Sequence, residues 1–147
     1  MRNYIRCAMK RTMNSAYRDE ILEHYREPLN YGKLLSCTVS SKQTNPFCGD
    51  EIEIYVKFDK NFLGVLANPP PRWTWAIQEI AFTGKGCAIS IAGASMLTEY
   101  AKGKTKKELT KFSQEDMLRL LGIEVSETRK KCALLGWSIL QDCLSNN

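Results

Sequence analysis

The sequence lacks the features that mark membrane-spanning, secreted and nucleic-acid-binding proteins. No apolar run approaches the length that a membrane span needs. No apolar signal-peptide core precedes the cysteines, which disfavours an oxidising, secreted setting for them. The lysines and arginines form no motif interleaved with aromatic residues, so we interpret most of them as solvated surface. We therefore expect a cytoplasmic protein that contacts neither a membrane nor nucleic acid.

Two common cysteine and histidine signatures are also missing. The chain has no C-x-x-C pair, which excludes a zinc ribbon and a thioredoxin motif. Its single histidine, His24, falls within a helical pattern and is expected at the surface. Six cysteines are nevertheless many for 147 residues. In a reducing compartment such cysteines bind metal, act in catalysis or are simply buried.

The length and composition predict one domain with a hydrophobic core. The chain has 147 residues, of which 44% are hydrophobic, and a formal net charge of +5 that could steer an acidic protein partner. The first residues are basic and contain no acid, so we expect a flexible basic extension over residues 1–16 and a single domain over residues 17–147. The alternative is a transit peptide, which would place the protein in an organelle matrix. Met9 and Met13 are alternative start positions for the chain.

Periodic patterns place strands before helices. After an amphipathic helix over residues 15–28, with Tyr17, Ile21, Leu22 and Tyr25 on one face, the chain turns to strand patterns. We expect strands over residues 36–41, 51–59 and 76–82, with residues 62–67 pairing back as a hairpin. Three consecutive prolines make residues 68–75 a loop that exposes Trp73 or Trp75.

The second half of the chain is helical. Helices are expected over residues 84–103 and 126–144, with two short helices between them that begin at capping boxes, Thr105 with Glu108 and Ser113 with Asp116. Strands followed by helices predict an α+β protein: a small antiparallel three-stranded sheet covered by helices, with a helical C-terminal half.

Three cysteines sit at comparable junctions between elements. Cys48 precedes a strand, Cys87 lies between a strand and a helix, and Cys132 lies in the early turns of the last helix. Asp50 follows Cys48 by two positions, so both side chains point the same way on an extended chain, and Gly49 lets the backbone bend between them. Three thiolates and a carboxylate suit tetrahedral zinc or iron. The alternative is three small buried thiols.

The position of two of these thiols within helices suggests a further expectation. Helix N-terminal turns favour anions, so Cys87 and Cys132 are expected to have lowered thiol pKa values.

The residues around these cysteines resemble a known family. The stretches "NPFCGDEIEIYV", "GKGCAISIAGASMLTEYAKGKT" and "RKKCALLGW" are similar to the U-type iron–sulfur cluster assembly proteins, the IscU, SufU and NifU N-terminal family. "YRDEILEHYREPLNYG" resembles the opening helix of that family, so the resemblance covers Tyr17 to the end of the chain. The resemblance implies a three-stranded antiparallel sheet packed with helices. It also implies that zinc or a cluster is bound by four residues: Cys48, Asp50, Cys87 and Cys132.

Four departures bear on the subtype. Lys131 stands where IscU-type members have histidine, and "GIEVSETRK" stands where they have a chaperone-binding "LPPVK". The SufU-type "RxKC" pattern matches Arg129, Lys131 and Cys132, but the insertion usual in SufU-type members between the last two site cysteines is missing. The stretch "VLANPPPRWTW" lengthens the interval before Cys87, as a neutral decoration or as a partner-binding loop.

The resemblance implies iron–sulfur cluster assembly and leaves its form open. As a scaffold, the protein would hold a transient [2Fe–2S] cluster on Cys48, Cys87 and Cys132 and pass it to apo iron–sulfur proteins. As a zinc-dependent sulfur acceptor, it would take sulfur on Cys48 from a cysteine desulfurase, with Lys131 and Arg129 giving electrostatic assistance. Whether the protein counts as an enzyme, and whether a frataxin-like protein takes part, stays open.

A third alternative is a structural zinc-binding domain without transfer activity.

In each of the first two cases we expect the remaining cysteines, Cys7, Cys37 and Cys143, to be dispensable for the chemistry. Cys143 falls on the apolar stripe of the last helix together with Leu135, Ile139 and Leu140.

Overall fold

The computed structural model describes residues 15–62, 64, 66 and 69–146. Most of the predicted N-terminal extension, residues 1–14, lies outside this part, and residues 15 and 16 already belong to a helix that runs over residues 15–26. None of the helices in the described part of the chain is long and apolar enough to cross a membrane.

Three antiparallel strands form one sheet in the order β1 (Val39–Asn45), β2 (Asp50–Asp59) and β3 (Ala76–Lys85). Strand β2 is central, and its alternate residues are apolar because they face the helices. The four inward apolar side chains are all buried: Ile52, Ile54, Val56 and Phe58. Asn45 pairs with Asp50, so the β1–β2 connection is a tight turn over residues 46–49.

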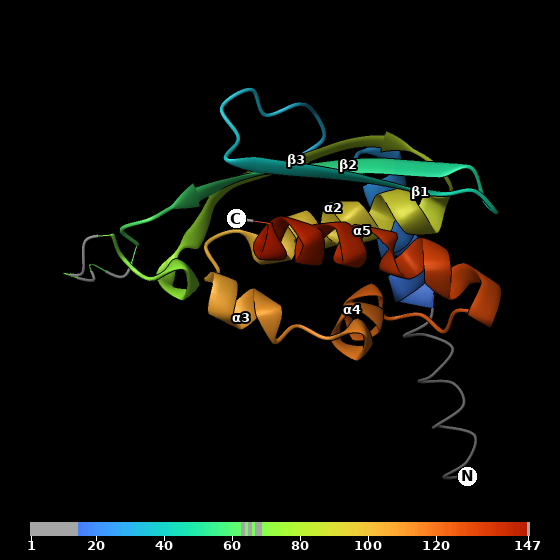
Figure 1. Cartoon of the computed structure of the whole chain (residues 1–147). Coiled ribbons are helices and arrows are strands. Elements are labelled where there is room, and N and C mark those ends of the chain that lie inside the picture. The colour runs from blue at the N-terminus through green and yellow to red at the C-terminus, as the bar shows by residue number, and fades with distance from the viewer. Residues whose placement is uncertain (1–14, 63, 65, 67–68, 147) are drawn as a thin grey trace, which may run out of the picture.

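Helices form a second layer on one face of this sheet (Figure 1). The two long ones, α2 (Ala88–Ala101) and α5 (Glu127–Ser145), pack against each other and against the strands. The short α3 (Lys106–Thr110) and α4 (Gln114–Leu121) pack against α5 from the side away from the sheet. A short 3-10 helix, η1 (Arg72–Thr74), precedes β3. The predicted α+β class, with its three-stranded sheet and helical C-terminal half, is confirmed.

Local sequence signals determine where the short helices begin and end. Both predicted capping boxes are present, with the Thr105 and Ser113 side chains accepting hydrogen bonds from the backbone of Glu108 and Asp116. Helix α4 ends at Gly122, whose φ of 71° is left-handed, a conformation that glycine adopts at little cost.

Several details differ from the sequence-based expectations. Strand β1 begins at Val39, so Cys37 precedes the strand in a turn, where its backbone N–H donates to the carbonyl of Leu34. The described residues of the expected strand over 62–67, which are 62, 64 and 66, lie in no strand, and the others lie outside the described part. The strand predicted over residues 36–41 is therefore present but displaced along the chain, whereas the described residues contradict a strand over 62–67, because local patterns do not reveal which stretches pair.

The first helix also turns a different face inward. Ile21 is buried, but Leu22 and Tyr25 are exposed, and His24 is half-buried with its Nδ1 2.7 Å from Ser95 Oγ. His24 is thus only partly at the surface as expected, because its ring also contacts a polar partner on α2.

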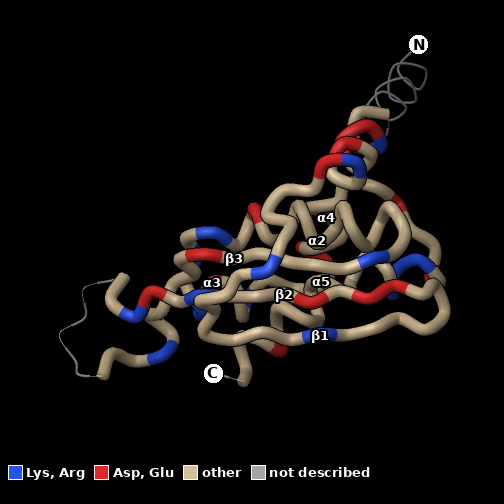
Figure 2. Tube along the Cα trace, turned by 90° about the horizontal axis from the view of Figure 1, so that it is seen from above, with Lys and Arg blue, Asp and Glu red and all other residues tan. Residues whose placement is uncertain are grey.

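Trp73 and Trp75, which lie in and next to η1, differ in exposure. Trp73 is exposed, whereas Trp75 is buried with its ring tilted against Phe58. Lysines, arginines and acidic residues alternate along much of the described chain trace in Figure 2. Some of them pair across the strands, as Lys57 does with Glu79 at 3.6 Å.

Candidate metal centre

The β1–β2 turn presents a cysteine at one end of the sheet. Cys48 is exposed within the turn over residues 46–49, and Gly49 after it has a φ of +67°. A left-handed residue there reverses the chain so that Asp50 enters β2 pointing inward, only 1% exposed. The predicted role of Gly49 in bending the backbone between the two side chains agrees with this conformation.

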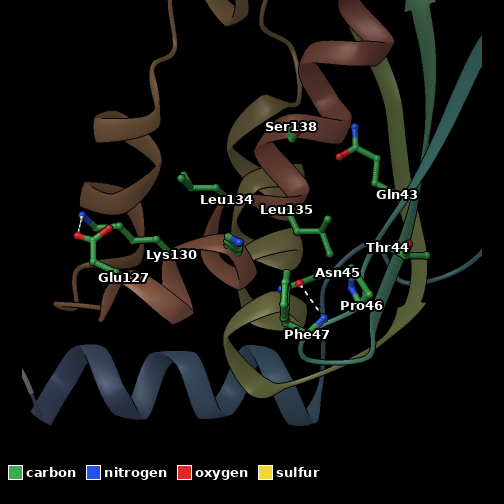
Figure 3. A pocket seen from close by; sticks show the side chains of 11 residues that line it. Gln43, Thr44, Asn45, Pro46, Phe47, Glu127, Lys130, Leu134, Leu135 and Ser138 are labelled. Atoms are coloured by element: carbon green, nitrogen blue, oxygen red, sulfur yellow. Dashed lines mark hydrogen bonds and ion pairs between the residues drawn. The ribbon is translucent and has the colours of Figure 1, made fainter.

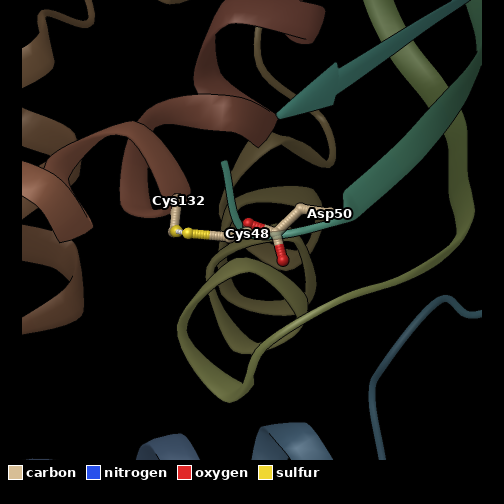
Figure 4. Close-up of side chains that lie close together, drawn as sticks. All are labelled: Cys48, Asp50 and Cys132. Carbon is tan, nitrogen blue, oxygen red and sulfur yellow. Dashed lines mark hydrogen bonds between the residues drawn. The ribbon is translucent and has the colours of Figure 1, made fainter. Parts of the chain in front are cut away.

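Helix α5 brings a second sulfur to the same place. Cys132 is buried, and its Sγ lies 3.2 Å from the Sγ of Cys48 (Figure 4). Ligand atoms of Cys48, Asp50 and Cys132 all lie within 4.8 Å of one another. Residues from a turn, a strand and the last helix therefore converge in a group that could hold a metal ion.

The Asp50 carboxylate is held by one oxygen only. Its Oδ1 accepts hydrogen bonds from the backbone N–H of Cys87 at 2.8 Å and from Ser90 Oγ at 3.2 Å. Its Oδ2 is buried and has no hydrogen-bond partner among the described residues. A bare buried carboxylate oxygen is costly unless a cation binds it. This oxygen, beside two sulfurs, therefore fits a metal ligand.

Both hydrogen bonds to Asp50 Oδ1 come from the β3–α2 junction, where position 86 has no room for a side chain. Cys87 is the N-cap of α2, and Gly86 precedes it. A Cβ at Gly86 would collide with Asp50 Oδ1 and with Ser90 Oγ. Glycine at this position thus allows the carboxylate to reach the backbone of Cys87.

Cys87 itself stands beside the three-donor group. Its half-buried Sγ lies 3.7 Å from Ser90 Oγ and is not among the atoms within 4.8 Å of one another. Its proximity to Cys132 also helps to raise the pKa of that thiol. The structure thus gathers three of the four predicted ligands directly, and Cys87 stays a predicted fourth ligand.

Burial raises the pKa of the Cys132 thiol well above its usual range, and its hydrogen bond to Cys48 raises it further. The expectation of a lowered value was wrong for Cys132. This residue lies beyond the first turn of α5, which begins at Glu127, so the helix N-terminus helps it little, and burial dominates.

Comparison with known proteins places this arrangement in a family. The sequence profile described as "NifU-like N terminal domain" matches residues 16–146. The chain belongs to the NifU-like N-terminal domain family.

Relatives of this chain have been described both as sulfurtransferases and as scaffolds. The chain is 30% identical to the zinc-dependent sulfurtransferase SufU of Bacillus subtilis (strain 168), over 88% of this chain and 89% of that protein. It is 35% identical to the iron–sulfur cluster assembly scaffold protein IscU 1 of Archaeoglobus fulgidus, over 72% of this chain and 60% of that protein.

Solved structures agree with the fold. The crystal structure of FiSufU from the thermophile Fervidobacterium islandicum AW-1 superposes with a TM-score of 0.67 at 26% identity. The superposition covers 85% of this chain and 93% of FiSufU. The family resemblance drawn from the three cysteine motifs is thus confirmed.

A groove borders the centre of this NifU-like domain (Figure 3). It has a volume of about 510 Å³ and is lined by residues 43–47 on one side and by residues of α5, including Leu134 and Leu135, on the other. Phe47 stands at its edge, 78% exposed, and the Nζ of Lys131 lies 4.6 Å from the centre of its ring.

The two basic residues predicted to assist the chemistry lie apart from each other. Lys131 is exposed and contacts Phe47 in the loop that carries Cys48. Arg129 is exposed and lines a different pocket with Arg18 and Ile123. Electrostatic assistance therefore stays a prediction, with Lys131 the better placed of the two.

Sequence reasoning missed three residues of the centre: Asn45, Phe47 and Ser90. Asn45 and Phe47 lie within the "NPFCGD" stretch, so proximity to the motif was a signal for both. Ser90 lies three positions after Cys87, one helical turn away, a spacing that places its hydroxyl near the helix start.

Proposed function

We propose that this protein supports iron–sulfur cluster assembly by accepting sulfur on Cys48 from a cysteine desulfurase. The observation that carries the proposal is the exposure of Cys48. Within the three-donor group, Asp50 and Cys132 are buried, and Cys48 alone is exposed, at the tip of a tight turn. A donor cysteine on another protein could therefore reach this sulfur.

Zinc is the metal that best suits the residues at this centre. Cys48, Asp50 and Cys132 would hold it, with Cys87 as the predicted fourth ligand. A mixed set of thiolates and one carboxylate is a zinc-type ligand set, and the bare Oδ2 of Asp50 supplies a site for a cation. Bound zinc would supply positive charge that favours the thiolate forms of the cysteines.

The transfer itself is a thiol–disulfide type exchange. The Cys48 thiolate would attack the outer sulfur of the persulfide on the donor cysteine. A new S–S bond forms at Cys48, the S–S bond of the donor breaks, and the donor leaves as a thiolate. The persulfide thus moves to Cys48 without any net oxidation. Lys131, beside the loop at Phe47, would favour the approach of an anionic persulfide.

The similarity to scaffold proteins supports a second step after sulfur transfer, in which a cluster is assembled and delivered. A [2Fe–2S] cluster would be a transient cargo held on Cys48, Cys87 and Cys132, and apo iron–sulfur proteins would receive it. A frataxin-like protein is a further candidate partner, and the cytoplasm is the proposed location. A structural zinc domain without transfer activity is less well supported, since it would have no need of an exposed cysteine.

A persulfide-transfer assay tests the proposal. The full chain, loaded with zinc, is incubated with a cysteine desulfurase carrying labelled persulfide sulfur, and the label on each cysteine is located by mass spectrometry. We expect label on Cys48, lost in Cys48→Ser and kept in the control Cys37→Ser. Label that survives in Cys48→Ser, or a wild type that takes none, would overturn sulfur acceptance at Cys48.

A further inference from the structure

Asn45 is a buried polar residue at the base of the turn that carries Cys48. It is the last residue of β1, pairs in register with Asp50 and is only 6% exposed. A buried side-chain amide needs partners for both its carbonyl oxygen and its NH2 group. Its partners therefore indicate why asparagine stands there.

The two ends of the Asn45 amide bind different parts of the centre. Its Nδ2 donates to the Sγ of Cys132 at 3.5 Å, a contact between residues 87 positions apart in the sequence. Its Oδ1 accepts from the backbone N–H of Phe47 at 3.3 Å, drawn as the dashed line in Figure 3. One side chain thus links helix α5 to the turn.

The contact to Phe47 is common in turns and does not explain the rest. Asparagine often accepts a hydrogen bond from the backbone two residues ahead, and such residues are usually exposed. Serine or aspartate could make the same contact. The contact to Cys132 needs a hydrogen-bond donor at that position. Ionised aspartate has no donor, and the shorter serine side chain does not reach that sulfur.

We propose that Asn45 is a positioning residue for the metal centre. It donates to the Cys132 sulfur from outside the ligand set while fixing the loop that presents Cys48. The inference rests on the proposed zinc-binding function and concerns how the chain orients its ligands. Groups that bind metal ligands from outside orient the ligand atoms and tune how strongly they donate electrons to the metal.

Two variants separate the contact to Cys132 from the contact to Phe47. Asn45→Asp keeps an oxygen for the Phe47 N–H and places a negative charge beside the sulfur. Asn45→Ser keeps the turn contact and leaves no group that reaches Cys132. Asn61→Asp is the matched control, because Asn61 is exposed in a turn after β2.

Metal binding is measured on the full, metal-free chain by titration with Co²⁺ and by zinc competition. We expect the zinc dissociation constant to rise about 10- to 100-fold in Asn45→Asp and less in Asn45→Ser. The absorption band of Co²⁺ bound to cysteine sulfur should shift in both variants, because the sulfur loses its N–H donor. The control should match the wild type, and the metal-free variants should melt within a few degrees of it.

The outcomes distinguish this inference from the function on which it rests. Unchanged zinc affinity and an unchanged Co²⁺ spectrum in both variants would overturn the role of Asn45 and leave the proposed function intact. Unfolding of both metal-free variants would also overturn it, since Asn45 would then hold the fold and not the ligand. If the wild type bound neither metal, the proposed zinc centre itself would be overturned.

Discussion

Asp50 is buried with one carboxylate oxygen hydrogen-bonded and the other without a partner among the described residues. In the metal-free protein such a carboxylate is a source of instability, because burial in a low-dielectric interior penalises its charge. The same oxygen gains most when a cation binds. If the proposed metal site forms, Asp50 would lower the stability of the metal-free protein and raise its affinity for metal.

We expect Asp50→Asn to abolish the zinc-induced rise in melting temperature while the metal-free variant melts at least as high as the metal-free wild type. The asparagine carbonyl oxygen can still accept from the Cys87 N–H, whereas its NH2 group cannot bind a metal. Calorimetry with and without zinc measures both quantities. Asp59→Asn, at the other end of β2, is the control. A zinc response that persists in Asp50→Asn would exclude Asp50 as a ligand.

Cys143 illustrates a thiol with a purely structural environment. It is fully buried on α5 beside the carbonyl of Ile54, and burial raises its pKa to about 12 from an ordinary value of 9.0. Between these values the unfolded chain releases the thiol proton and the folded chain retains it. This residue thus stabilises the fold below pH 9, and that contribution is lost as the pH rises toward 12.

We expect Cys143→Ala to cost about 1 kcal/mol of unfolding free energy at pH 7, because it removes one small buried group. Its stability relative to the wild type should then improve as the pH rises above 9, since the variant has no thiol to titrate. Urea unfolding at pH 7 and pH 10.5 checks both parts. A stability difference that does not change with pH would contradict the raised pKa.

At the scale of elements, local patterns predicted the sheet and helices well. The alternation in β2 and the two capping boxes depend only on neighbouring residues, so they could be read directly. The start of β1 and the inward face of the first helix depend on partners far along the chain, such as Ser95 for His24. Those features could not be predicted, because sequence spacing does not encode which elements meet.

Some features of the candidate centre could be predicted from local sequence, and others depend on how distant elements pack. Cys48 and Asp50 lie in one short motif, and their shared direction follows from strand geometry. The bond from Asn45 to Cys132 and the bond from Ser90 to Asp50 exist only once α5 and α2 have packed against the sheet. The raised pKa of Cys132 was missed for the same reason, since burial is a property of the packed molecule.

The β3–α2 junction yields a prediction at this scale. We expect Gly86→Ala to weaken zinc binding and lower the melting temperature, because the added Cβ collides with Asp50 Oδ1 and pushes the carboxylate off the Cys87 backbone. Gly103→Ala is the control: its φ is +74° and its Cβ would meet nothing within 4 Å. It should lose about 1 kcal/mol to backbone strain and keep its zinc affinity. Equal zinc affinity in Gly86→Ala and the wild type would contradict this account.

At the scale of the whole molecule, the metal should act as a crosslink between distant parts of the chain. Zinc that binds only the folded protein stabilises it by about 2.7 kcal/mol at 100 times its dissociation constant. For a domain of this size we expect a rise in melting temperature of roughly 10 °C. A chelator should reverse it. A melting temperature that changes neither with zinc nor with chelator would mean that the centre binds no zinc.

The last helix completes a centre that begins at the first hairpin. Cys48 and Asp50 belong to the β1–β2 hairpin, but the second sulfur of the group lies on α5, far along the chain from it. During synthesis, an emerging chain lacks the Cys132 sulfur until α5 has been made and has packed against the sheet. We therefore expect metal that needs all three donors to bind only after the last helix has docked.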